Sequence, residues 1–149
     1  MEEMLTVLNE ELCPVGQAPR ETAHREGLLH GVVHCWIVSR RMGQVGIWFQ
    51  QRARTKKDFP DYYDLAVGGH IDCGETPEAA VLREMREEIG LTAEPSRLRY
   101  LGYTREDVRF PGFFDREVGY VYLYEDDCPA FAPGDEVERM VWVPLRELM

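Results

Sequence analysis

The sequence lacks any long uninterrupted hydrophobic stretch. No run of about 18 apolar residues, the length that a transmembrane helix requires, occurs in its 149 residues. The first residues, MEEMLTVLNEEL, are acidic and contain no apolar segment of the kind found in secretory signal peptides. We therefore expect a cytoplasmic protein without a transmembrane helix.

Cysteine is scarce and scattered, and basic residues are outnumbered. The four cysteines, at positions 13, 35, 73 and 128, form no CxxC pair, and this favours reduced thiols over a disulfide framework. Lys and Arg number 17 against 27 Asp and Glu, a net charge of −10. Because binding to phosphate polymers and to anionic lipid depends on clustered cations, we expect neither nucleic acid nor membrane as a partner.

The chain has the length and the hydrophobic fraction, 44%, of one globular domain, predicted over residues 1–149. It contains no internal repeat, and its short Gly- and Pro-containing loops are typical of an α/β domain. Two polar segments, 9–27 and 105–116, are expected to be loops. Hydrophobic and β-branched runs predict strands at 4–8, 30–38, 45–51, 63–67, 97–103, 117–124 and 139–143.

The clearest element is a helix over residues 76–90. Thr76 is a favourable N-cap, Pro77 suits the first helical turn, and Gly90 suits the C-terminal cap. Its predicted buried stripe is Ala79, Leu82, Met85 and Ile89.

The opposite face of this helix concentrates negative charge. Glu84, Glu87 and Glu88 stand at i, i+3 and i+4, where like charges repel and the helix dipole near the C-terminus favours cations. Arg83 can offset part of this cost by pairing with Glu87, and a hard divalent cation such as Mg²⁺ or Mn²⁺ offsets more. The alternative is an ordinary solvated helix face.

The loop before the helix completes a recognisable motif. From Gly69 to Leu91 the chain reads GHIDCGETPEAAVLREMREEIGL, and it matches G-x5-E-x7-R-E-U-x-E-E-x-G-U, where U is a bulky aliphatic residue. Every defined position agrees, so the segment resembles the Nudix box.

The resemblance implies an α/β/α sandwich with a mixed sheet and hydrolysis of a diphosphate linkage. It implies that the metal, Mg²⁺ or Mn²⁺, is bound by Glu84, Glu87 and Glu88. Gly69 would offer its backbone to the metal. Arg83 would orient a glutamate through a salt bridge, and Glu75 would support the helix end.

A looser resemblance extends over most of the chain, toward the type I isopentenyl-diphosphate isomerases. It rests on LLHGVVHCWIV, QQRARTKKDFPDYYDLAVGGH, DREVGYVY and GDEVERMVWVPL. That family places a catalytic cysteine immediately before the Gly-His pair, where this chain has Gly68, and Cys73 is not the matching thiol. The isomerases also tend to carry a degraded Nudix box. Both differences favour hydrolysis.

Some of the residues that bind the metal ion in the isomerases nevertheless have counterparts in this chain. His30 and His70 match its histidine ligands, His24 matches with a one-residue shift, and Asp115 and Glu117 stand where its glutamate pair would be. Imidazole suits Mn²⁺ or Zn²⁺ better than Mg²⁺. Glu117 is the candidate for an additional ligand or general base, and His70 the histidine most expected at the site.

Candidate substrate contacts lie in one basic stretch and in two groups of aromatic residues. The resemblance places Arg52 and Lys56, within RARTKK, near the diphosphate, although such a stretch can also be a solvated hairpin end. Phe110 and Phe113 are the predicted substrate-contacting phenylalanines. Aromatic residues also follow the basic stretch, at Phe59, Tyr62 and Tyr63, where they can stack a base, pack an isoprenoid-like tail or belong to the core.

The preferred hypothesis is metal-dependent hydrolysis of a nucleoside diphosphate derivative or similar organic diphosphate. In it, Glu87, Glu88 or Glu117 accepts the proton of the attacking water. An isomerase and a non-catalytic diphosphate-binding sensor are the alternatives, although a sensor is expected to have a broken Nudix box. The expected partner is a small-molecule diphosphate, and a homodimer is compatible with the family.

Overall fold

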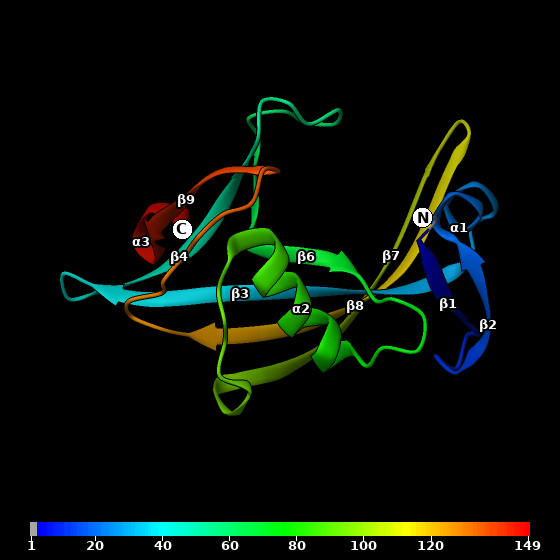
Figure 1. Ribbon diagram of the computed structural model, residues 1–149, viewed down its shortest axis with the longest axis horizontal. Coiled ribbons are helices and arrows are strands. Elements are labelled where there is room, and N and C mark those ends of the chain that lie inside the picture. The colour runs from blue at the N-terminus through cyan, green and yellow to red at the C-terminus, as the bar shows by residue number, and fades with distance from the viewer. Residues whose placement is uncertain (1–2) are drawn as a thin grey trace.

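The computed structural model describes residues 3–149, and Figure 1 shows an extended sheet with helices placed around it. The elements, in chain order, are β1 (Met4–Leu8), β2 (Pro14–Pro19), α1 (Arg20–Glu26), β3 (Leu29–Arg41), β4 (Gln44–Arg52), β5 (Tyr63–Leu65), β6 (Val67–His70), α2 (Pro77–Ile89), a 3₁₀ turn η1 (Pro95–Arg97), β7 (Leu98–Phe110), β8 (Phe113–Glu125), β9 (Val137–Pro144) and α3 (Leu145–Leu148). None of the helices in this described part is long and apolar enough to cross a bilayer.

The long strand β3 organises the sheet. It pairs in parallel with β8, from Leu29 opposite Arg116 to Val38 opposite Glu125, and antiparallel with β1, β4 and β6. The sheet is therefore mixed, as expected. Helix α2 lies across β3 and β6 (Figure 1), and the core between them includes Val33, Cys35, Ile37, Val81, Met85 and Ile89. A strand buried in this way reads as a continuous hydrophobic run, which is why its position could be predicted.

Helix α2 has the predicted ends and a shifted buried face. The Thr76 hydroxyl accepts a hydrogen bond from the Ala79 N–H at 3.1 Å, and Gly90 caps the C-terminus in the left-handed region at φ 65°. The buried row is Ala80, Val81, Met85 and Ile89, whereas Ala79 is exposed and Leu82 only half-buried. The prediction for Ala79 was wrong because it lies two residues, or about 200°, away from Val81 around the helix axis.

Two segments expected to be loops are regular structure. Residues 9–27 contain β2 and α1, and residues 105–116 belong to the β7–β8 hairpin, which pairs from Leu98 opposite Tyr124 to Phe110 opposite Phe113. The first half of β7 corresponds to the strand predicted at 97–103. Its second half, residues 105–110, is exposed except for the half-buried Val108, so it carries no alternation of polar and apolar residues that would mark it as a strand. This strand is held in place by its backbone hydrogen bonds to β8 and not by the burial of one of its faces.

Candidate functional site

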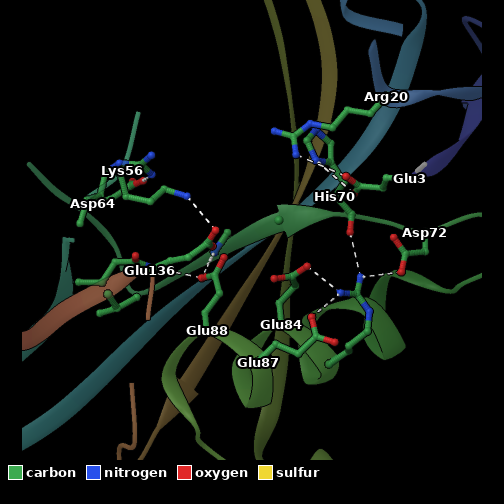
Figure 2. Close-up of a pocket in the computed structure, with 16 residues that line it drawn as sticks. Glu3, Arg20, Lys56, Asp64, His70, Asp72, Glu84, Glu87, Glu88 and Glu136 are labelled. Atoms are coloured by element: carbon green, nitrogen blue, oxygen red, sulfur yellow. Dashed lines mark hydrogen bonds and ion pairs between the residues drawn. The ribbon is translucent and has the colours of Figure 1, made fainter. Parts of the chain in front are cut away.

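The main cavity, of about 570 Å³, lies between the acidic face of α2, strand β6 and the end of β4 (Figure 2). Its lining is almost entirely polar or charged, and Figure 2 shows Glu84, Glu87 and Glu88 rising into it from α2. The lining residues are Glu3, Arg20, Gln50, Arg52, Lys56, Asp64, Gly68, Gly69, His70, Asp72, Arg83, Glu84, Glu87, Glu88, Glu136 and Val137. The acidic helix face is thus the floor of a cavity rather than a freely solvated surface.

Arg83 holds the carboxylates of this floor in place. Its guanidinium donates two hydrogen bonds to Glu75, at 2.8 and 2.9 Å, one to Glu84 Oε1 at 2.7 Å and one to Glu87 Oε2 at 3.2 Å. A further bond, of 3.1 Å, reaches the backbone carbonyl of His70. The bidentate contact also keeps the pKa of Glu75 below its usual range. The pairing of Arg83 with Glu87 confirms the sequence-based expectation.

Glu88 is the most enclosed of the floor carboxylates. It accepts hydrogen bonds from the Gln50 side chain at 3.0 Å and from the Gly68 N–H at 3.4 Å. Burial, followed by the neighbouring charge of Glu84, raises the pKa of Glu88 to about 8, and burial also raises the pKa of Glu84. Two partly desolvated carboxylates facing each other are a donor set that suits a hard divalent cation.

Gly69 brings its backbone close to these oxygens. A Cβ built at this position would collide with the carboxylate of Glu84, so any larger residue would displace that side chain. The glycine is needed here for the close approach of strand β6 to α2. This placement is compatible with the backbone role that the sequence motif implies.

A second cluster of ligating groups lies beside the main cavity. His24 from α1, His30 from β3, His70 from β6 and Glu117 from β8 offer ligand atoms that all lie within 4.8 Å of one another. The three imidazole centroids are 5.2 to 5.4 Å apart. We refer to these four residues together with Asp115 as the histidine centre.

Polar atoms converge in the histidine centre without conventional partners. His30 Nδ1 lies 2.9 Å from the Leu28 carbonyl oxygen, to which it can only donate, so in the neutral ring Nε2 is the nitrogen that carries the lone pair. That Nε2 lies 3.4 Å from Asp115 Oδ1 and 3.9 Å from Glu117 Oε1. The buried atoms that have no hydrogen-bond partner include Nε2 of His24, His30 and His70, and Oδ1 of Asp115.

These groups fit a borderline divalent cation. Burial lowers the pKa of His70 to about 3 and also lowers the pKa of His24, so both imidazoles are neutral at physiological pH, as a metal ligand must be. Burial and a hydrogen bond with Asp115 raise the pKa of Glu117 to about 8. Three imidazoles with carboxylates are the donors that Mn²⁺ or Zn²⁺ accepts.

His70 joins the two sites. It is one of the residues lining the main cavity, and its ring also belongs to the histidine centre. Figure 2 shows it beside Arg20 and Glu3, whose Oε1 lies 3.8 Å from His70 Nδ1. Glu117 belongs to the histidine centre and is not among the described residues that line the main cavity.

Two of the predicted phosphate contacts reach the cavity from its other side. Arg52 donates from Nε to the Asp58 carbonyl at 3.1 Å, and Lys56 Nζ lies 3.1 Å from Glu136 Oε1. Both line the cavity, whereas the neighbouring Arg54 and Lys57 are exposed and do not. The basic stretch is therefore divided between the site and the solvent.

The two phenylalanines predicted to contact substrate lie elsewhere. Phe110 and Phe113 meet at the tip of the β7–β8 hairpin, with ring centroids 6.3 Å apart. The Phe113 ring lies 5.2 Å from that of His24, so it borders the histidine centre. Neither is among the described residues around the main cavity, and their contact with substrate stays a prediction.

Some cavity residues were not identified from the sequence. Gln50, Asp64 and Arg20 come from three different elements and belong to no linear motif. Gln50 and Arg52 are polar at alternate positions of one strand, which is the only local signal that they share a face. The position of Asp64 follows from its pairing opposite Gln50 across β4 and β5.

At the position where the isomerases carry a catalytic thiol, this chain has Gly68, which has no side chain. Gly68 lines the cavity and directs its N–H to Glu88. Cys73 is exposed, borders a different hollow together with Glu75 and Tyr120, and donates its backbone N–H to the Met4 carbonyl at 3.1 Å. No cysteine lies among the described residues of the main cavity.

The chain is similar, in sequence and in structure, to proteins of one family. A family model described as the NUDIX domain matches residues 28–149. An uncharacterised Nudix hydrolase of Clostridium acetobutylicum is 33% identical over 150 aligned positions, covering 99% of this chain and 72% of the relative. The isopentenyl-diphosphate Δ-isomerase of Escherichia coli is 28% identical, covering 99% and 80%. The crystal structure of DR0079 from Deinococcus radiodurans matches with a TM-score of 0.70 and 28% identity, covering 98% and 86%.

Removal of the Arg83 guanidinium should destabilise the fold as well as the site. In Arg83→Met, Glu75 and Glu84, whose side chains are only 16% and 14% exposed, lose their cationic partner. We expect the free energy of unfolding in urea to fall by about 2 kcal/mol or more. The control, Arg25→Met, breaks an exposed pair with Glu26 and should change the free energy of unfolding by less than about 1 kcal/mol. Equal effects would contradict the structural role assigned to Arg83.

Proposed function

The chain belongs to the Nudix family, whose hydrolases act on phosphoric anhydrides, and we propose that its own reaction is the hydrolysis of a diphosphate linkage that depends on Mg²⁺ or Mn²⁺. The proposed substrate is a nucleoside diphosphate derivative or a similar organic diphosphate. One observation carries this proposal: the carboxylates of α2 line the same cavity as two cations, Arg52 at the end of β4 and Lys56 in the loop that follows. A diphosphate can bind directly to Arg52 and Lys56, and through a divalent cation to the carboxylates of α2.

The residues of α2 are proposed to hold the cation. Glu84, Glu87 and Glu88 supply carboxylate oxygens, and the backbone of Gly69 lies beside them. A divalent cation bound there neutralises phosphate charge and lowers the pKa of water, which makes hydroxide available near neutral pH. Arg83 keeps Glu84 and Glu87 oriented for this task.

The cationic side of the cavity is proposed to orient the diphosphate. Arg52 suits a bidentate contact with phosphate oxygens, and Lys56 provides a point charge. In hydrolysis, the oxygen of water bonds to one phosphorus, the bond from that phosphorus to the bridging oxygen breaks, and the second phosphate leaves. Glu87 or Glu88 accepts the proton of the water, and Glu117 can do so only for a substrate that reaches the histidine centre.

The histidine centre is proposed to hold a further divalent cation, Mn²⁺ or Zn²⁺. Support comes from the convergence of buried nitrogen and oxygen atoms that have no other partner. The sensor alternative is not favoured, because the residues of the Nudix motif are intact and assembled around one cavity. Any turnover of a diphosphate compound would exclude it.

Neutralising a floor carboxylate should abolish most of the activity. We expect Glu87→Gln and Glu88→Gln each to lower kcat on the best substrate of a diphosphate panel by at least about 100-fold, with the fold intact by circular dichroism. Glu78→Gln, at an exposed position in the first turn of the same helix, is the control and should retain wild-type kcat. Wild-type rates in both active-site variants would refute the proposed metal ligands.

The histidine centre can be tested independently of activity. Mn²⁺ bound only to the folded protein should raise the melting temperature, because a ligand at 100 times its Kd stabilises by about 2.7 kcal/mol. The His24 side chain is 15% exposed, whereas that of His30 is fully buried, so His24 is the histidine to substitute. In His24→Gln the Mn²⁺-dependent rise of the melting temperature should shrink, while in Glu88→Gln the part of that rise that comes from the histidine centre should remain. Full retention of the shift in His24→Gln would argue against a metal at this centre.

The isomerase alternative makes a distinct chemical demand. Moving a double bond requires one group that delivers a proton to carbon and another that removes one, and Gly68 provides neither. We therefore expect no enzyme-dependent incorporation of deuterium from heavy water into isopentenyl diphosphate. Incorporation that disappears in Cys73→Ser would overturn the hydrolase proposal and identify Cys73 as the acid–base group.

A further inference from the structure

The loop between β4 and β5, residues 53–62, presents aromatic rings to solvent beside the main cavity. Phe59 and Tyr62 are 64% and 62% exposed, and their ring centroids are 5.3 Å apart. Together with Arg52, Tyr63 and Asp64 they line a hollow of about 250 Å³. Large aromatic side chains gain little by remaining in water, so their joint exposure around a hollow calls for an explanation.

This hollow adjoins the proposed phosphate site. Arg52 and Asp64 line both the hollow and the main cavity. On strand β4, Arg52 lies two residues beyond Gln50 and on the same face, a distance of about 7 Å, and Gln50 contacts Glu88 at 3.0 Å. A diphosphate held near Glu88 and Arg52 would therefore direct its attached group toward the aromatic rings.

The loop is exposed yet firmly held. The Arg52 N–H donates to the Tyr62 carbonyl at 2.7 Å, and the Asp61 N–H donates to the Arg52 carbonyl at 3.1 Å. The Arg52 side chain also bonds to the Asp58 carbonyl at 3.1 Å, and Gln51 bonds to the Asp61 carbonyl at 3.1 Å. These bonds fix the position of the aromatic rings from both ends of the loop.

The backbone at the first aromatic residue is strained. Phe59 adopts φ 50°, in the left-handed region that a bulky residue rarely occupies. Asp61 follows at φ 63°, in the same region, which aspartate enters more readily. Such conformations persist only where the surrounding bonds enforce them, and they concentrate at ligand-binding positions. The loop thus holds Phe59 in an unfavourable conformation in which its ring faces outward.

We propose that this hollow is the subsite for the heteroaromatic base of a nucleoside diphosphate substrate, stacked against Phe59 and Tyr62. The assignment rests on the proposed function, because Arg52 must bind the diphosphate of the same molecule. An aliphatic tail would cover Arg52 and Asp64 without offering them hydrogen bonds, which is costly for charged groups. The polar edge of a base offers such bonds, and its flat face matches the aromatic rings.

Binding of non-hydrolysable ligands measures the contribution of the nucleoside, and the variants then assign it to the base. The probes are adenosine and uridine 5′-(α,β-methylene)diphosphate, compared by calorimetry in the presence of Mg²⁺ with methylenediphosphonate, which has the methylene-bridged anionic group and neither ribose nor base. For the wild type we expect at least one nucleotide to bind roughly tenfold more tightly than methylenediphosphonate, the gain of a single stacking contact. Phe59→Ala and Tyr62→Ala should each reduce this ratio several-fold.

Two control variants separate stacking from general damage. Tyr62→Phe keeps the ring and should retain the ratio of affinities. Tyr103→Ala removes a ring of similar exposure, 60%, from strand β7 and should also retain it. The affinity for methylenediphosphonate should be unchanged in all four variants.

Several outcomes would overturn the subsite. These are equal affinity for nucleotides and methylenediphosphonate, a preference for nucleotides that survives both alanine variants, and tighter binding of dimethylallyl diphosphate that is lost in Phe59→Ala. If the preference for nucleotides behaves as expected but no diphosphate compound is hydrolysed, the proposed function fails while the base subsite stands.

Discussion

The organisation of this protein depends on one guanidinium group. Arg83 contacts Glu75 from the loop before α2, Glu84 and Glu87 from α2 itself, and the backbone of β6 at His70. Without a cation at this point, the acidic face of α2 would repel itself and the adjoining strand would lose an anchor. The carboxylates can therefore be collected on one helix face only because their mutual repulsion is balanced locally by this side chain.

The distribution of charge over the chain also affects the binding of an anionic substrate. The net charge of −10 repels a diphosphate, and the floor of the cavity adds to that repulsion. Arg52 and Lys56 are attached to the opposite wall, by bonds to the Asp58 carbonyl and to Glu136, and stand apart from the α2 carboxylates. In the proposed function, the site therefore separates two tasks: the helix binds the cation, and Arg52 and Lys56 orient the anion.

Prediction from the sequence succeeded where the signals were local. The ends of α2, the acidic face and the pairing of Arg83 with Glu87 follow from residues within a few positions of one another, and the structure confirms them. The first half of β7 was predicted, at 97–103, but its second half was missed, because it is maintained by pairing with β8 and has almost no buried face. Gln50 and Asp64 were missed because their place in the cavity depends on the alignment of β4, β5 and β6.

Strand β6 is only four residues long, Val67–His70, yet each of its last three residues serves the polar centres. Gly68 binds Glu88 through its N–H, Gly69 lies against Glu84, and His70 contributes its ring to the histidine centre. If binding of a cation at one centre displaced this strand, the groups of the other centre would move with it. Thermodynamic reciprocity would then require each centre to change the affinity of the other by the same factor.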